Sequence, residues 1–150
     1  DAFSPIVNGH FRLEQAFDLP PLLGVVGGTA EWLFSRGDMV SVTASAAVSL
    51  VGLPSETIAV RFWADVQAAY GLEDIAMPPF RIVKEKRATF LQTPDQLRRR
   101  PNRHNQWRNL YLAGDWTSTG VPATIEGSIR SGAAAASAVF DQVKKTSENI

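Results

Sequence analysis

The sequence predicts an α+β fold, in which a mainly antiparallel sheet with one covering helix precedes a C-terminal strand and a long helix. Three observations lead to this class. Apolar and polar residues alternate in several short segments of the first 90 residues, helical spacing appears over 55–70, and a short apolar run precedes a long amphipathic stretch near the C-terminus. Alternation is the period of a strand with one buried face, and spacings of three and four are those of a helix.

The first strand is expected near the N-terminus, where alternation starting at Val7 places Val7, Phe11 and Leu13 on one face. The stretch 19–28 is apolar but is interrupted by prolines and glycines, so it predicts a loop followed by a short strand rather than a helix.

A hairpin is expected next. Residues 31–34 form its first strand, 36–38 supply the turn, and 39–45 alternate again as its second strand. Residues 80–90 interleave charged with apolar side chains and predict a further strand.

The clearest helix is predicted over 55–70. Ser55 is a suitable N-cap, Glu56 places negative charge at the positive end of the helix dipole, and Gly71 ends the pattern. The apolar residues at helical spacing are Ile58, Phe62, Trp63, Val66 and Tyr70. We therefore expect an amphipathic helix that packs on the sheet.

The last third of the chain has a different character. Residues 94–108 are polar and predict an exposed loop, which includes the arginine cluster 98–103. Residues 109–114 form a short apolar run typical of a buried parallel strand. A long helix is then expected from about Ala123 to Lys144.

The composition excludes several classes of function. Fifteen basic and 15 acidic residues balance, so no chain-wide positive field favours nucleic acid. The absence of cysteine removes disulfides and thiolate sites and is compatible with a reducing compartment. The only two histidines, His10 and His104, lie far apart, which argues against a metal site.

No apolar run approaches the roughly 18 residues of a spanning helix, and the start of the chain lacks the features of a leader peptide. The chain is therefore expected to be soluble. Because it starts without methionine, we expect Asp1 to be an internal position of a longer protein.

The segment 110–132 carries the chemistry. A buried strand ending at Gly114 and Asp115 would place a carboxylate at the edge of the sheet where open α/β folds bind ligands. The chain then passes through Pro122 to a helix N-terminus, which favours an electron-rich oxygen. The alternative is an ordinary turn followed by a core helix. Small side chains at 127, 131 and 134 would let that helix pack closely on a cofactor or on neighbouring backbone.

Three elements in this order, Ala113-Gly114-Asp115, Pro122-Ala123-Thr124 and Glu126-Gly127, resemble the C-terminal signature of the phytoene desaturase branch of the FAD-dependent amine oxidase superfamily. The resemblance implies that 109–150 are the last strand, loop and helix of a Rossmann-like FAD-binding domain and that 1–108 are part of a substrate-binding domain. It implies FAD contacts at Gly114, Asp115, Pro122, Ala123, Thr124 and Ile125.

Within that branch, segments 4–8, 31–34, 42–47 and 84–90 are similar to the hydroxysqualene dehydroxylases. This resemblance implies an FAD-dependent oxidoreductase that reductively removes the hydroxyl of hydroxysqualene to give squalene in hopanoid synthesis. One alternative is a desaturase of phytoene or a related carotenoid precursor. An alternative of another class is a non-catalytic module that binds isoprenoids or other proteins.

The chain departs from the family in one respect. The Gly-x-Gly-x-x-Gly fingerprint is absent, and the glycine pair Gly27-Gly28 does not follow that pattern or open a predicted helix. We therefore expect the pyrophosphate cradle upstream of Asp1, and expect this chain alone to bind FAD weakly or not at all. It would also self-associate if apolar surface normally covered by the missing part is exposed.

The catalytic residues are unknown from sequence, with Lys86 and Arg87 as weak candidates. A cation near a flavin stabilises its reduced anion or polarises a leaving hydroxyl. The alternative is that both are solvated charges that protect an edge strand from aggregation. For His10, the alternatives are a proton donor and a surface or packing residue.

Four aromatic residues are candidates to line a hydrocarbon tunnel or to fill the core: Trp32, Phe34, Phe62 and Trp63. Residues 19–26 either touch a membrane surface or lie under the sheet, and the arginines of 98–103 either rest on anionic headgroups or are solvated. The expected location is the cytoplasm, with peripheral contact to the cytoplasmic membrane as the alternative.

Overall fold

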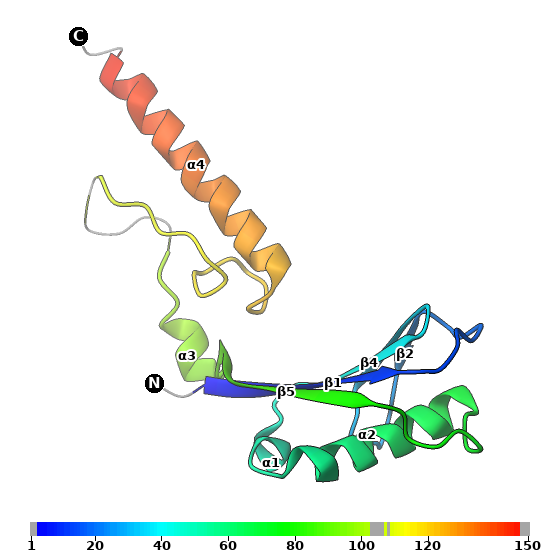
Figure 1. The fold of residues 1–150 in the computed structure, drawn as a ribbon. Helices are drawn as coiled ribbons and strands as arrows, with labels where there is room; N and C mark the ends of the chain where they lie inside the picture. Colours follow the sequence, from blue (N-terminus) through cyan, green and yellow to red (C-terminus); the bar gives the residue numbers. More distant parts are fainter. Residues whose placement is uncertain (1–2, 103–106, 108, 148–150) are drawn as a thin grey trace. The chain divides into compact units, whose positions relative to one another are not determined.

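The computed structural model describes residues 3–102, 107 and 109–147 and contains two compact units that divide between Thr89 and Phe90. The domain boundary predicted between 108 and 109 stays a prediction. The elements, drawn in Figure 1, are β1 (Phe3–Arg12), β2 (Leu22–Gly24), β3 (Trp32–Arg36), β4 (Met39–Ala44), α1 (Val48–Val51), α2 (Ser55–Tyr70), β5 (Phe80–Phe90), α3 (Pro94–Arg98) and α4 (Ile125–Ser147).

The first unit is built on a five-stranded sheet with the order β2-β3-β4-β1-β5. The β2-β3, β3-β4 and β4-β1 pairs are antiparallel, which confirms the predicted sheet and its hairpin. In the register, Val7 lies opposite Ala44 and Phe11 opposite Val40. All four are buried, as alternation predicts for the inner face of a sheet.

Helix α2 covers that inner face (Figure 1). Ile58 and Phe62 are fully buried, and the ring of Trp63 lies 5.3 Å from that of Phe11. Gly9 lets strand and helix approach closely, because a Cβ there would be 2.8 Å from the Phe62 ring. The predicted helix over 55–70 is therefore confirmed, including its amphipathic packing on the sheet.

The two ends of α2 differ in how well they were predicted. Gly71 ends the helix in the left-handed conformation, with φ of 68°, as expected. Ser55 as N-cap is wrong: the cap is Pro54, and Ser55 is the first helical residue. Proline holds its own φ near the value needed before a helix, and its carbonyl accepts the N–H of Ile58 at 3.2 Å.

The glycine pair 27–28 lies in a bend after β2 and does not open a helix. The Asp65 carboxylate on α2 accepts the N–H groups of Thr29 and Ala30, both at 2.7 Å. A side chain at Gly28 would be too close to that carboxylate, because a Cβ there would lie 2.9 Å from it. Gly28 therefore lets the loop pack on α2.

The opposite face of the sheet is not covered by α2, and this divides the four aromatic residues proposed for a tunnel. Phe62 and Trp63 are core residues, so a tunnel-lining role for them is wrong. Trp32 and Phe34 are 47% and 44% exposed and alternate with buried Leu33 on β3. Successive side chains on a strand point to opposite faces of the sheet. Trp32 and Phe34 therefore point away from the core face, on which Phe62 and Trp63 pack.

In the second unit, α4 confirms the predicted long helix, but two expectations fail. Part of the 94–108 loop is a short helix, α3, which begins with Thr93 as N-cap and Pro94 as first residue. The strand predicted over 109–114 is wrong: the described residues there are irregular, and Leu110 is 47% exposed. In the described part of this unit, only Phe90, the last residue of β5, belongs to a strand. The segment 109–114 therefore has no strand there with which to pair.

Candidate functional site

The loop that follows Gly114 is held to α4 by hydrogen bonds. The Gly114 N–H donates to the Ser131 hydroxyl at 2.7 Å, and that hydroxyl donates to the Ser128 carbonyl at 2.8 Å. The Gly114 carbonyl accepts the buried Thr117 hydroxyl at 2.8 Å. Gly114 has φ of 143° and lies under Trp116, so a side chain at 114 would be strained.

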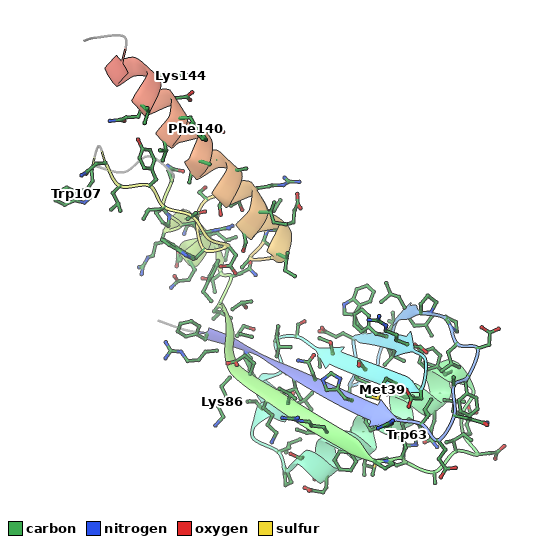
Figure 2. The ribbon with its side chains drawn as sticks, turned by 45° about the horizontal axis from the view of Figure 1, so that its top comes forward. Met39, Trp63, Lys86, Trp107, Phe140 and Lys144 are labelled. Atoms are coloured by element: carbon green, nitrogen blue, oxygen red, sulfur yellow. The ribbon has the colours of Figure 1, made fainter. Side chains whose placement is uncertain are left out.

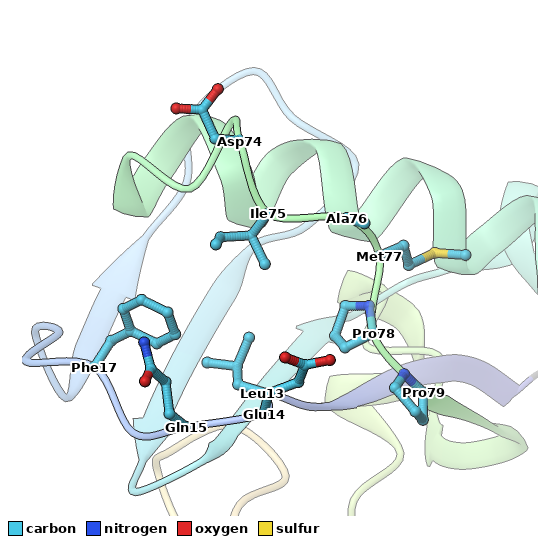
Figure 3. Close-up of a pocket in the computed structure, with 10 residues that line it drawn as sticks. All are labelled: Leu13, Glu14, Gln15, Phe17, Asp74, Ile75, Ala76, Met77, Pro78 and Pro79. Carbon is cyan, nitrogen blue, oxygen red and sulfur yellow. The ribbon is translucent and has the colours of Figure 1, made fainter.

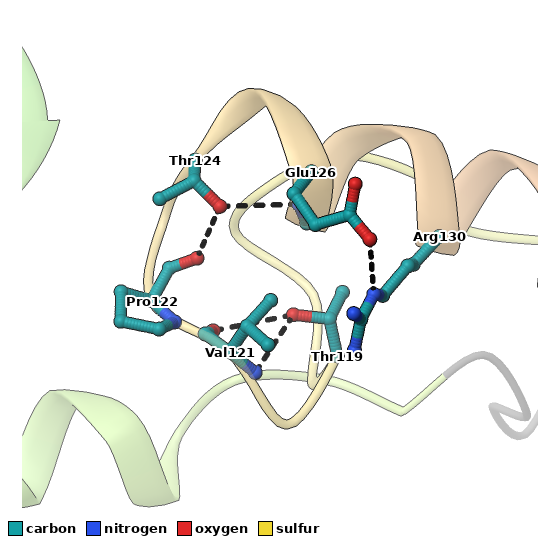
Figure 4. A network of polar contacts seen from close by, with 7 residues as sticks. Thr119, Val121, Pro122, Thr124, Glu126 and Arg130 are labelled. Carbon is teal, nitrogen blue, oxygen red and sulfur yellow. Dashed lines mark hydrogen bonds and ion pairs between the residues drawn. The ribbon is translucent and has the colours of Figure 1, made fainter.

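The start of α4 is capped by Thr124, immediately before the helix (Figure 4). Its hydroxyl accepts the Gly127 N–H at 3.1 Å and donates to the Pro122 carbonyl at 3.1 Å. A Cβ at Gly127 would be 3.2 Å from that same carbonyl. The cap thus fixes where the helix begins, and Gly127 allows the loop to pass close to it.

The small-residue stripe on α4 therefore contacts the chain's own backbone. Gly127 packs beside the segment 121–122, and Ser131 binds Gly114. Of the two predicted roles for the stripe, the structure shows close packing against neighbouring backbone. Gly114 and the capping segment 122–124 are consequently both attached to the first two turns of one helix.

Arg100 holds the middle of the same loop. Its guanidinium donates to the carbonyls of Asp115 at 2.6 Å and Val121 at 2.7 Å, and to the Thr119 hydroxyl at 3.1 Å. The prediction of a solvated arginine cluster is wrong at this position. Arg98 and Arg99 are exposed as expected, and Arg103 lies outside the described residues.

Two of the predicted cofactor contacts have side chains available to a ligand. Asp115 is half-buried, and no described residue donates a hydrogen bond to its carboxylate. Ile125, at the first turn of α4, is 82% exposed. The N–H of Ala123 is bound by the side-chain carbonyl of Gln92 at 3.2 Å. A carboxylate to which no described residue donates suits a ligand with hydroxyl groups, and the N-terminus of α4 suits a ligand with electron-rich oxygens.

A cavity of about 440 Å³ lies between this loop and α4. Its lining is rich in hydroxyl and other polar groups and consists of Asn102, Leu112, Thr117, Ser118, Thr119, Arg130, Ser131 and Ala134. Arg130 also forms an ion pair with Glu126 at 2.6 Å (Figure 4). The cavity adjoins the loop that the sequence motif singled out, although it does not include the six predicted contacts.

The weak catalytic candidates lie in the other unit. Lys86 is exposed and extends from the edge strand β5 (Figure 2). The Arg87 guanidinium lies 4.1 Å from the centroid of the Phe3 ring. His10 Nδ1 lies 2.9 Å from the Ser41 hydroxyl, and register places this pair beside Phe34. A catalytic role for any of the three stays a prediction.

A second cavity, of about 580 Å³, lies where the chain leaves β1 (Figure 3). It is lined by residues 13–15, Phe17 and 74–79, and Figure 3 shows Phe17 and Ile75 facing into it. None of the predicted site residues lines this cavity.

Within the described ranges, no helix is long and apolar enough to cross a bilayer. The described residues also hold no group of three or more potential metal ligands, and His104 lies outside them. In the segment 19–26, Leu19, Leu23 and Val25 pack on the core, whereas Leu22 and Val26 are exposed.

Residues 2–140 match the family of flavin-containing amine oxidoreductases. Hydroxysqualene dehydroxylase of Rhodopseudomonas palustris is 49% identical over 138 residues, which are 92% of this chain and 33% of that protein. The enzyme of the same name from Zymomonas mobilis is 46% identical over 91% of the chain. The 15-cis-phytoene desaturase of Synechococcus elongatus is 23% identical over 91% of the chain. The chain spans about a third of the length of these relatives.

Proposed function

Because the chain belongs to the family of flavin-containing amine oxidoreductases, we propose that it forms part of an FAD-dependent oxidoreductase that acts on a long isoprenoid. The site contacts would be those that the motif indicates. They are Gly114, Asp115, Pro122, Ala123, Thr124 and Ile125.

The observation that carries this proposal is the fixed geometry of the loop and helix start. Gly114 is bound to Ser131, and Thr124 caps Gly127, so both ends of the motif are attached to the first two turns of α4. A ligand gains affinity from a site whose backbone is already ordered, since less conformational entropy is lost on binding. Both ends of the motif would thus be ordered before a ligand binds.

The residues have separate roles in this proposal. The Asp115 carboxylate accepts hydrogen bonds from ribityl or ribose hydroxyls. The N-terminus of α4 stabilises an electron-rich carbonyl through its dipole, and exposed Ile125 supplies an apolar contact. When bound, the flavin would supply the hydride chemistry that these side chains cannot provide.

The proposed substrate is hydroxysqualene, which would be reduced to squalene with release of water in hopanoid synthesis. Two relatives named for this dehydroxylation are 46–49% identical, whereas the phytoene desaturase is 23% identical. The sheet face opposite α2 suits such a molecule. Its exposed Trp32 and Phe34 lie beside the polar pairs His10–Ser41 and Asn8–Thr43, so apolar surface adjoins hydrogen-bonding groups, as a hydrocarbon with one hydroxyl requires.

The domain assignment is also a proposal. In the whole protein, 109–150 would complete a Rossmann-like domain. Residues 1–108 would belong to the substrate domain. We further propose a cytoplasmic enzyme that contacts the membrane peripherally, and we propose that exposed Leu22 and Val26 take part in that contact.

The first experiment uses the full-length protein. Wild type, Asp115→Ala and the control Asp141→Ala are incubated with FAD, freed of excess and examined by visible spectroscopy. Asp141 is an exposed carboxylate on α4, so its removal should leave the flavin absorbance unchanged. The proposal expects retained flavin in wild type and a sharp loss in Asp115→Ala. A folded wild type that never retains flavin would reject the oxidoreductase in favour of a binding module.

The second experiment is product analysis. Full-length protein with reduced FAD and hydroxysqualene should give squalene, and the same protein with an oxidant and phytoene should give no desaturated product. Desaturated product from phytoene and no squalene from hydroxysqualene would instead support the desaturase alternative.

A further inference from the structure

Arg100 differs from its neighbours in the arginine cluster. Arg98 is exposed and pairs with exposed Asp95, and Arg99 is also exposed. The Arg100 side chain is half-buried, its Nε is fully buried, and its guanidinium lies 5.7 Å from the centroid of the Phe90 ring. Among the described arginines of the cluster, Arg100 is therefore half-buried and the other two are exposed.

The guanidinium of Arg100 bonds one loop at three places. Nη2 contacts the Asp115 carbonyl and the Thr119 hydroxyl, and Nη1 contacts the Val121 carbonyl. These acceptors are 15, 19 and 21 residues away in sequence. A planar fork with donors in fixed directions sets the relative positions of acceptors, which a single ammonium group does not.

Stability alone is a poor explanation for this arginine. No described carboxylate pairs with Arg100, and its Nε has no hydrogen-bond partner within the described part of the chain. A buried charge without an ionic partner is unfavourable, and apolar side chains of similar volume often serve stability as well or better. What the arginine supplies is the placement of three backbone and hydroxyl groups.

The placement matters for the two ends of the motif. The α4 side already fixes Gly114 through Ser131 and the helix start through Thr124. Arg100 fixes the intervening loop through the main chain of Asp115 and Val121. The Asp115 carbonyl is thereby restrained, whereas no described residue donates to its carboxylate, which stays available.

We infer that Arg100 is the positioning residue of the flavin loop: its guanidinium holds residues 115–121 so that the Asp115 carboxylate and the α4 N-terminus face one FAD molecule. This inference rests on the proposed function. Arg100 acts through the loop and does not itself contact the cofactor.

The experiment compares Arg100→Lys with Arg99→Lys in the full-length protein. Both changes replace a guanidinium by an ammonium group and keep the positive charge, but only the guanidinium of Arg100 is bonded to the loop. The FAD dissociation constant of the apoprotein is measured by flavin fluorescence well below the melting temperature, together with the band shape of the bound flavin. We expect Arg100→Lys to weaken FAD roughly tenfold to a hundredfold and to alter the flavin bands, as loss of a positioning contact does. Arg99→Lys should match wild type.

Equal FAD affinity and equal spectra in the two lysine variants would overturn the inference and leave the proposed function intact. A wild type that holds no flavin would overturn the proposed function itself. If Arg100→Lys fails to fold, Thr119→Val decides the matter, because it removes one acceptor of the fork at similar volume. Weaker FAD binding by a folded Thr119→Val supports the inference, and unchanged binding overturns it.

Discussion

The backbone N–H of Gly114 donates to the hydroxyl of Ser131 at 2.7 Å, which joins the first residue of the loop to the second turn of α4. Ser131 is 5% exposed, so the bond is shielded from water. In Ser131→Ala the Gly114 N–H loses this acceptor, and a buried donor left unpaired costs about 1–3 kcal/mol. We expect a lower melting temperature and weaker FAD retention in the full-length protein.

Ser137→Ala is the matched control for that experiment. Ser137 lies on the same helix but is exposed, so its loss should change neither the melting temperature nor the retained flavin. Equal behaviour of the two alanine variants would contradict the role of the Gly114–Ser131 bond.

Two glycines in the second unit should respond in opposite directions to the same change. Gly114→Ala places a methyl group against Trp116 Nε1 at a backbone φ of 143°. Strain of this kind costs about 1–3 kcal/mol, so the variant should be less stable and hold less FAD. Gly132→Ala lies within α4, where a Cβ meets no atom within 4 Å. It should gain roughly 0.5–1 kcal/mol from helix propensity.

Thermal and denaturant unfolding of the two variants tests this pair. If both variants are less stable than wild type, the space around Gly132 is not open to a methyl group. If both are more stable, a side chain does not strain the backbone at Gly114.

The outcome for each part of the fold follows from where its determining contacts lie. Val7, Phe11 and Phe62 were predicted to be inward-facing because the side-chain period of a strand or helix is local and reports one buried face. The apolar run 109–114 shows the limit of that argument. Apolarity predicts that a strand would be buried, but a strand also needs neighbours that local sequence does not reveal.

In the candidate site, Arg100 and Thr124 differ in how far their roles could be predicted from the sequence. The acceptors of Arg100 are loop carbonyls 15 and 21 residues away, and a charged residue beside two exposed arginines carries no signal for that burial. Thr124 did carry a signal, because threonine followed by acidic Glu126 is typical of a helix start. Asp115 as a cofactor ligand stays a prediction.

The cap at Thr124 gives a prediction about the start of α4. Thr124→Val keeps the volume but removes the oxygen that accepts the Gly127 N–H at 3.1 Å. Loss of an N-cap costs about 1 kcal/mol, and Thr124→Ser should retain most of that contribution. The measurement is denaturant unfolding of both variants, with FAD affinity as the second readout. If serine is no better than valine, the hydroxyl does not cap the helix.

Close packing between β1 and α2 predicts strain at Gly9. A Cβ there would lie 2.8 Å from the Phe62 ring and 3.1 Å from Phe11, both fully buried. Gly9→Ala should therefore destabilise the first unit by about 1–3 kcal/mol, as overpacked cores do. Gly52→Ala, with no atom near its Cβ, is the control and should be nearly neutral.

Phe62→Leu tests whether the ring is the cause of that strain. Combined with Gly9→Ala, it should lose less stability than the sum of the two single changes, because the smaller side chain relieves the contact. Strict additivity in denaturant unfolding would show that the two positions do not compete for space.

The sheet face opposite α2 gives the final prediction, which concerns the substrate. Trp32 and Phe34 are half-exposed and lie on the face opposite the core, so truncating them should affect a bound hydrocarbon more than the fold. In the full-length enzyme, Trp32→Ala and Phe34→Ala should each raise the KM for hydroxysqualene roughly tenfold through lost apolar contact. The kcat should stay within about twofold, because binding that is equal in ground and transition states does not alter it. Val48→Ala on α1 is the control, since Val48 is 70% exposed and does not belong to the sheet. Unchanged KM in both aromatic variants would place the substrate elsewhere, whereas a fall in melting temperature without a change in KM would make the two rings part of the protein's packing.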